Sequence, residues 1–192
     1  YEYLTLFSTY PRRHQDGVNE YRDIIQTAKT LGADYITFHG DRTRTPLPTT
    51  LEVYCSTVKE LMDLAAEQDI AIAQENVSWC KSSDLEFLKQ VDHQLRPYGL
   101  YYTLDVKQAK RVGLCWQDYL PIMSGRLANV HISDQTEEQS CLLPGEGEMD
   151  YTQLFQALSR EGYTGDFMVE VYQHNYKQYQ QLKDSREYLK KQ

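Results

Sequence analysis

Apolar residues along this chain follow two alternating patterns. In the first they recur every three to four positions, as Val18, Tyr21, Ile25 and Ala28 do before Gly32, which is typical of one face of a helix that ends at a glycine. In the second, apolar residues follow one another in short runs, which is typical of buried strands. The patterns predict helices over residues 18–31, 51–65, 83–95 and 150–158, and from about residue 176. They predict strands over residues 3–7, 34–39, 70–75, 101–105, 127–132 and 167–171.

Two polar positions mark expected helix starts. Ser83 with Glu86 resembles a capping box, in which each side chain bonds the backbone near the other residue. Asp150 precedes an apolar helical pattern and is expected to cap that helix.

Six strands that alternate with helices predict an α/β domain with a parallel sheet, and we expect residues 1–192 to form a single domain. An open doubly wound sheet and a (β/α)8 barrel both fit this alternation. No Gly-rich GxGxxG turn follows the first predicted strand, so the dinucleotide-binding form of the open sheet is disfavoured. A barrel needs eight units and ~250 residues, so this chain would hold about six units, and the other two would lie before Tyr1.

Four predicted strands end at or next to a residue type that binds metals. These residues are Glu75, Asp105, His131 and Glu170. In a parallel barrel the carboxyl ends of the strands meet at one mouth, so these side chains could converge despite their separation in sequence. Three carboxylates and one imidazole suit Mn²⁺, Co²⁺, Mg²⁺ or Zn²⁺. Taken singly, an acidic residue after a strand is as often a helix cap or a solvated loop residue.

A fifth strand-end residue is His39, which is either a further ligand, a substrate contact or a hydrogen-bonded structural histidine. Lys107 and Arg126 give no signal of their own. The sequence lacks the GxSxG and P-loop motifs, and neither Cys80 nor Cys141, which lie in predicted loops, has a histidine at a diagnostic spacing.

Composition narrows the class of protein. The net charge is −8 and the pI is about 5.1, which argues against a duplex nucleic-acid binder because such proteins carry basic faces. No run is long and apolar enough for a membrane span, and no signal peptide is visible. The four cysteines form no CxxC pair. We therefore expect a cytoplasmic protein with reduced thiols and no membrane partner.

The chain resembles the xylose isomerase-like (AP endonuclease family 2) TIM barrels. The most specific stretch is 142-LLPGEGEMDYTQLFQALSREGYTGDFMVEVY-172, which is similar to that family's PGxGxxD…L…GYxGxxxxEx ending. The segments AQEN, LDV and VHISD resemble the strand ends that supply its other ligands. The resemblance covers nearly the whole chain and implies a (β/α)8 TIM barrel, incomplete here, with the segments ordered as strands three to eight.

The resemblance also implies a site. The metal ligands would be Glu75, Asp105, His131 and Glu170, holding one divalent ion (Mn, Zn, Co or Mg). The catalytic pair would be Glu75 and Glu170. Substrate contacts would come from His39, Gln108 and Asp134.

Histidines needed for a trinuclear zinc site, as in the endonuclease branch, are absent from the matching segments 8-STYP-11 and 105-DVKQ-108. The resemblance therefore favours a metal-dependent isomerase or epimerase of carbohydrate metabolism. Such an enzyme would act on a small sugar or polyol-derived ketone through an enediolate. Assembly into a homo-oligomer is compatible with this interpretation. The alternatives are an AP endonuclease-like phosphodiesterase acting on abasic DNA and a non-catalytic sugar-binding relic.

Overall fold

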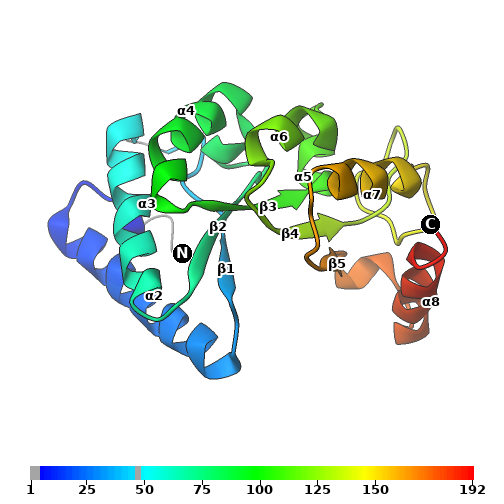
Figure 1. Ribbon diagram of the computed structural model, residues 1–192, viewed down its shortest axis with the longest axis horizontal. Helices are drawn as coiled ribbons and strands as arrows, with labels where there is room; N and C mark the ends of the chain where they lie inside the picture. The colour runs from blue at the N-terminus through cyan, green and yellow to red at the C-terminus, as the bar shows by residue number, and fades with distance from the viewer. Residues whose placement is uncertain (1–4, 46–48) are drawn as a thin grey trace. The chain divides into compact units, whose positions relative to one another are not determined.

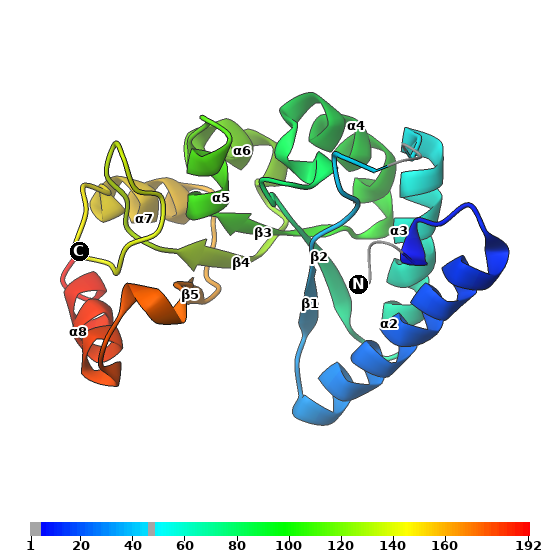
Figure 2. The same ribbon diagram turned by 180° about the vertical axis from the view of Figure 1, so that it is seen from behind.

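The computed structural model describes residues 5–45 and 49–192. By its internal contacts the chain divides into two compact units, residues 1–102 and 103–192. Each unit combines strands with helices, as the colours from blue to red trace in Figures 1 and 2. None of the described helices is long and apolar enough to cross a membrane.

The described residues of unit 1 form two strands and three long helices. Its elements are α2 (Pro11–Leu31), β1 (Tyr35–Phe38), α3 (Leu51–Ala66), β2 (Ala71–Glu75), η1 (Lys81–Ser83), α4 (Leu85–Leu95) and η2 (Arg96–Tyr98). β1 and β2 are parallel, in a register that sets Tyr35 opposite Ala71 and Phe38 opposite Gln74. Their carboxyl ends therefore lie side by side, which confirms the parallel pairing expected from the alternation of strands and helices.

The predicted helix ends of unit 1 are correct in one case and wrong in another. Gly32 ends α2 with φ of 71°, in the left-handed region that favours glycine. Ser83, by contrast, lies in η1 and does not begin α4. The cap of α4 is Asp84, whose side chain accepts a hydrogen bond from the Phe87 backbone N–H at 2.7 Å. The capping box is wrong by one residue because Asp84 offers the same chemistry as Ser83.

The strand predicted over residues 3–7 is wrong where the structure describes it; Tyr3 and Leu4 lie outside the described residues. Thr5 and Leu6 are helical. Leu6 is buried against Gly17 of α2, where an added Cβ would meet the Leu6 backbone. Phe7 stacks on Tyr54 of α3 with ring centroids 5.0 Å apart. These apolar residues therefore contribute to the core by packing on helices.

Unit 2 begins within β3 (Tyr101–Asp105). The other elements are α5 (Val106–Arg111), α6 (Trp116–Met123), β4 (Leu127–Ile132), α7 (Tyr151–Arg160), β5 (Phe167–Val169), η3 (Gln173–Asn175) and α8 (Tyr179–Leu189). In the order of the sheet β3 neighbours β4, and β4 neighbours β5. β4 and β5 are parallel, with Val130 opposite Phe167 and Ile132 opposite Val169. Asp150 caps α7 as predicted, by accepting a hydrogen bond from the Gln153 N–H at 2.8 Å.

The prediction of a buried strand over residues 167–171 is wrong in its burial and length. β5 ends at Val169, and Phe167 and Met168 are 39% and 53% exposed. β4 pairs with one edge of β5, and within the described residues no further strand pairs with its other edge. The described chain thus has five strands where the sequence predicts six.

Candidate metal centre

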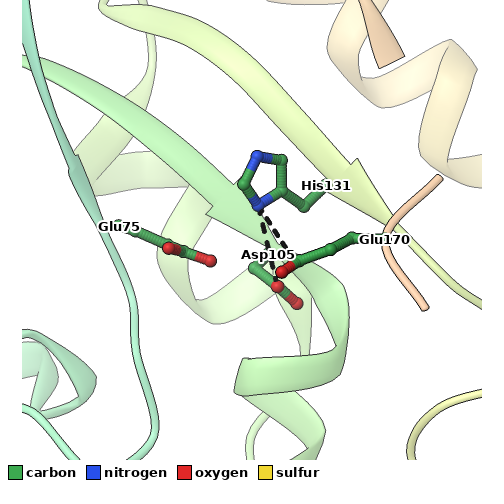
Figure 3. A group of neighbouring side chains, drawn as sticks. All are labelled: Glu75, Asp105, His131 and Glu170. Carbon is green, nitrogen blue, oxygen red and sulfur yellow. Dashed lines mark ion pairs between the residues drawn. The ribbon is translucent and has the colours of Figure 1, made fainter. Parts of the chain in front are cut away.

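Three of the predicted ligands come together in unit 2. Asp105 is the last residue of β3, His131 lies near the end of β4 and Glu170 directly follows β5. Each offers a ligand atom within 4.8 Å of the others. His131 Nδ1 lies 3.1 Å from Glu170 Oε2 and 3.9 Å from Asp105 Oδ2. Figure 3 shows the three side chains pointing toward one another.

The sheet itself positions two of these residues. His131 is opposite Met168 in the parallel register of β4 and β5. The Glu170 backbone N–H then donates to the Ile132 carbonyl at 2.9 Å, one step beyond the last paired residues. This bond continues the ladder past Val169 and holds the Glu170 main chain beside the end of β4. Side chains at the carboxyl ends of parallel strands are thereby fixed by backbone geometry.

Asp105 divides its two oxygens between two functions. Oδ1 accepts a hydrogen bond from the Gln108 backbone N–H at 2.9 Å and caps α5. Oδ2 faces the cluster, 3.1 Å from Lys107 Nζ. The side chain is buried, so its orientation is set by α5 on one side and by the cluster on the other.

Lys107 is a member of the cluster that the sequence does not reveal. It is 1% exposed, and its Nζ donates to Glu170 Oε2 at 2.8 Å as well as lying close to Asp105. Its ammonium group also lies 5.4 Å from the centre of the Tyr172 ring. The one available signal was its spacing, because a lysine two residues after a strand-end aspartate falls in the first turn of the next helix. From there it can fold back over the strand end.

The charges of the cluster stabilise one another. Burial alone lowers the pKa of Lys107, but attraction by Asp105 and bonding to Glu170 outweigh burial and raise that pKa. Burial likewise raises the pKa of Glu170, yet hydrogen bonding with His131, Asp105 and Lys107 prevails and leaves its pKa lowered. Glu170 is therefore ionised and Lys107 protonated at neutral pH.

In unit 1, Glu75 and His39 form a pair at the ends of β2 and β1. His39 Nε2 lies 3.3 Å from Glu75 Oε2, and the Glu75 side chain is buried at 3% exposure. Gln74 fixes the neighbouring main chain, because its Nε2 donates to the carbonyls of Phe38 and His39 at 3.1 and 3.0 Å. Tyr54 Oη in turn donates to Gln74 Oε1. Figure 3 labels Glu75 at the end of its strand.

The other predicted substrate contacts have different surroundings. The His39 side chain is 42% exposed, so it is accessible to a small molecule. Gln108 is buried near the start of α5. Asp134 is buried too, and its carboxylate accepts backbone N–H bonds from Gly145 at 2.8 Å and Met149 at 2.9 Å. Asp134 thus shapes the loop between β4 and α7, and its contact with substrate remains a prediction.

The donor set of unit 2 suits a divalent cation. Two carboxylates and one imidazole are ligands that Mn²⁺, Zn²⁺ and Co²⁺ accept, and the acidic pair also suits Mg²⁺. His131 offers Nδ1 toward both carboxylates, so the imidazole and carboxylate donors face the same point. The residues therefore fit the metal that the resemblance implies.

A family model described as "xylose isomerase-like TIM barrel" matches residues 3–192. The chain belongs to this family. Its fold is accordingly the α/β fold of a TIM barrel, of which the described residues contribute five strands to the eight of a closed barrel. No match is found among curated proteins.

Several solved structures are similar to this xylose isomerase-like chain. A D-tagatose 3-epimerase-like protein superposes with a TM-score of 0.82 at 21% identity, covering 97% of this chain and 72% of the other. The IolI protein with a zinc atom bound gives a TM-score of 0.78 at 20% identity, covering 96% and 73%. The 3-keto-D-glucoside 4-epimerase YcjR from E. coli gives 0.75 at 17% identity, covering 97% and 75%. At these identities the likeness establishes the fold.

Proposed function

We propose that this protein is a divalent-metal-dependent isomerase or epimerase of a small sugar or a polyol-derived ketone. The observation that carries the proposal is the convergence of Asp105, His131 and Glu170 in a chain of the xylose isomerase-like family. Two of the similar structures are named as epimerases or epimerase-like proteins of sugars, and a third holds zinc. These names support the reaction class.

We propose that Glu75 is the fourth metal ligand, with Asp105, His131 and Glu170. Glu75 ends β2 as Asp105 ends β3, and both side chains are buried at strand ends, where TIM barrels build their active sites. A bound Mn, Zn, Co or Mg ion would supply Lewis-acid stabilisation of negative charge on the substrate oxygens. Asp105 and His131 serve mainly to bind the metal.

Proton transfer is assigned to the two glutamates. One of Glu75 and Glu170 removes the proton from the carbon beside the substrate carbonyl, which leaves an enediolate, and the other returns a proton. Lys107 holds Glu170 by a 2.8 Å hydrogen bond, and His39 holds Glu75 through its 3.3 Å contact. Each carboxylate therefore has a cationic or hydrogen-bonding neighbour that fixes its direction before substrate arrives. His39, Gln108 and Asp134 remain the proposed substrate contacts.

The test is solvent deuterium exchange at the carbon beside the carbonyl, followed by NMR over a panel of ketoses, after the metal content of protein purified without chelator has been measured. Exchange reports proton removal even when the true product is unknown. We expect Glu170→Gln to slow exchange by at least ~100-fold, because a positioned acid–base group contributes about that much. Glu86→Gln, which alters an exposed residue of α4, is the control and should exchange at the wild-type rate.

The outcomes separate the alternatives. Full metal content with unchanged exchange in Glu170→Gln would remove Glu170 from the mechanism. Three zinc ions per chain together with cleavage of abasic DNA would favour the phosphodiesterase. Sugar binding without metal and without exchange would favour the non-catalytic relic.

A further inference from the structure

Unit 1 contains a pocket whose lining residues have no part in the proposed metal binding or proton transfer. Its volume is about 570 Å³, within the range of small-molecule sites, and it is lined by Arg42, Thr43, Arg44, Ser78 and Trp79. These residues come from two segments, one after β1 and one after β2. The pocket thus lies at the same ends of the strands as His39 and Glu75.

The two segments that form the pocket are held together by main-chain hydrogen bonds. Thr43 N–H donates to the Trp79 carbonyl at 3.1 Å, and Lys81 N–H donates to the Asp41 carbonyl at 2.8 Å. Between these bonds Arg42 and Cys80 form an antiparallel bridge. The Arg42 guanidinium lies 5.1 Å from the centre of the Trp79 ring, so the side chains of the pocket also support each other. The walls are therefore organised before a ligand binds.

The pocket carries positive charge in a protein with a net charge of −8. Among the described residues its lining includes two arginines and no acidic residue. The nearest acidic neighbour in sequence is Asp41, which is buried and paired with Lys81 at 3.3 Å, so its charge is already matched. Arg44 is exposed and makes no ion pair with any residue in the described part of the chain. An exposed guanidinium that makes no ion pair within its own chain can bind phosphate or carboxylate oxygens in a bidentate manner.

The pocket connects to the proposed site through direct contacts within unit 1. Trp79 packs edge-on against His39 with ring centroids 5.7 Å apart. His39 in turn contacts Glu75 at 3.3 Å. One side chain therefore separates the basic pocket from the carboxylate to which we assign proton transfer. Trp79 thus contacts His39 on one side of this chain of contacts and the Arg42 guanidinium on the other.

We propose that this pocket binds an oxyanion on the substrate, so that the substrate is a phosphorylated sugar or a sugar acid. The proposal rests on the proposed function for the reacting end of that molecule. Arg42 and Arg44 bind the phosphate or carboxylate oxygens, and the exposed part of the Trp79 side chain packs on the sugar carbons. The pocket thereby selects charged sugars over neutral ones.

The experiment measures binding by calorimetry, with chelator present so that the result does not depend on the metal site. The probes are inorganic phosphate, D-glucuronate and neutral D-fructose. We expect at least one anion to bind with a Kd of roughly 1 mM, and we expect Arg44→Gln to weaken it about tenfold, as the loss of a charge-assisted bond does. The matched control is Arg12→Gln, which removes the same charge from an exposed position of α2 and should leave binding unchanged.

The probes distinguish the two sources of the anion. Tighter phosphate binding identifies a sugar phosphate, and tighter glucuronate binding identifies a sugar acid. The proposal is overturned if neither anion binds, or if Arg44→Gln and Arg12→Gln affect binding equally. A chain that binds anions but holds no metal would keep this pocket and refute the proposed metal-dependent reaction.

Discussion

Lys107 offers the sharpest test of the cluster in unit 2. Replacing it with methionine keeps a long apolar stem and removes the ammonium group that contacts Asp105 and Glu170. The two carboxylates would then lose the ammonium group that they share as a counter-charge. We expect Lys107→Met to destabilise the metal-free protein and to make its stability strongly dependent on divalent metal.

The magnitude follows from burial. Lys107 and the Asp105 side chain are each 1% exposed, and removal of one partner from a buried ion pair costs about 3–5 kcal/mol. The Glu170 side chain is 40% exposed, so water screens part of its charge. We therefore expect a loss at the lower end of the range, about 3 kcal/mol of unfolding free energy.

The assay is urea unfolding with chelator, followed by tryptophan fluorescence, to which Trp116, a buried residue of α6 in the same unit, contributes. Lys183→Met is the control, because Lys183 is exposed on α8 and a surface change of this kind costs within about 0.5 kcal/mol. Adding Mn²⁺ or Zn²⁺ at about 100 times its Kd should return roughly 2.7 kcal/mol to the Lys107→Met protein.

Two results would contradict this prediction. If Lys107→Met costs no more than Lys183→Met, then Lys107 does not balance the charge of the cluster. If the variant is destabilised and no divalent metal restores it, then the carboxylates depend on Lys107 but do not form a metal site.

Two further predictions concern Glu170 and Gly40. The pKa of Glu170 is lowered in the folded protein from an ordinary value of 4.5, so the ionised Glu170 stabilises the fold above that pH and this stabilisation is lost as the pH falls. The stability difference between wild type and Glu170→Gln, measured by urea unfolding with chelator, should therefore be largest near neutral pH and shrink in acid. A difference that grows in acid would contradict the direction of the pKa shift. Gly40 has φ of 85° and an added Cβ would meet the Tyr54 hydroxyl, so Gly40→Ala should lower the unfolding free energy, measured by thermal unfolding, by about 2 kcal/mol or more. Gly125 has φ of 70° and open space around it, so Gly125→Ala should cost only the backbone strain of about 1 kcal/mol. Equal losses in the two variants would show that the Tyr54 contact is unimportant.

β3 and β4 are the strands whose positions the sequence predicts most accurately. The bounds of β3 and β4 are as predicted, because each is a short apolar run between polar segments. Prediction is worse where the conformation or burial of an apolar segment depends on residues far from it in the sequence. Phe7 packs on Tyr54 of α3, and the exposure of Met168 depends on which strands flank β5. Apolar spacing contains neither piece of information.

The candidate site shows the same division. Strand ends identify Asp105, His131 and Glu170, because the carboxyl ends of parallel strands meet and the residue types suit a metal. The sequence does not identify Lys107, because its importance lies in contacts with two residues, one of them 63 positions away. Nor does it identify the basic pocket, because Arg42 and Trp79 meet only through the pairing of two loops.

Asp105 also shows that the structural and functional interpretations of a strand-end acid are compatible. From the sequence they are rivals, since the residue is either a helix cap or a metal ligand. In the structure the two oxygens of the carboxylate have different partners, because Oδ1 caps α5 while Oδ2 faces the cluster. The cap fixes the rotation of the carboxylate, so that Oδ2 is aimed before any cation binds. A helix that begins directly after a strand therefore helps this fold to orient the carboxylate of a candidate metal ligand.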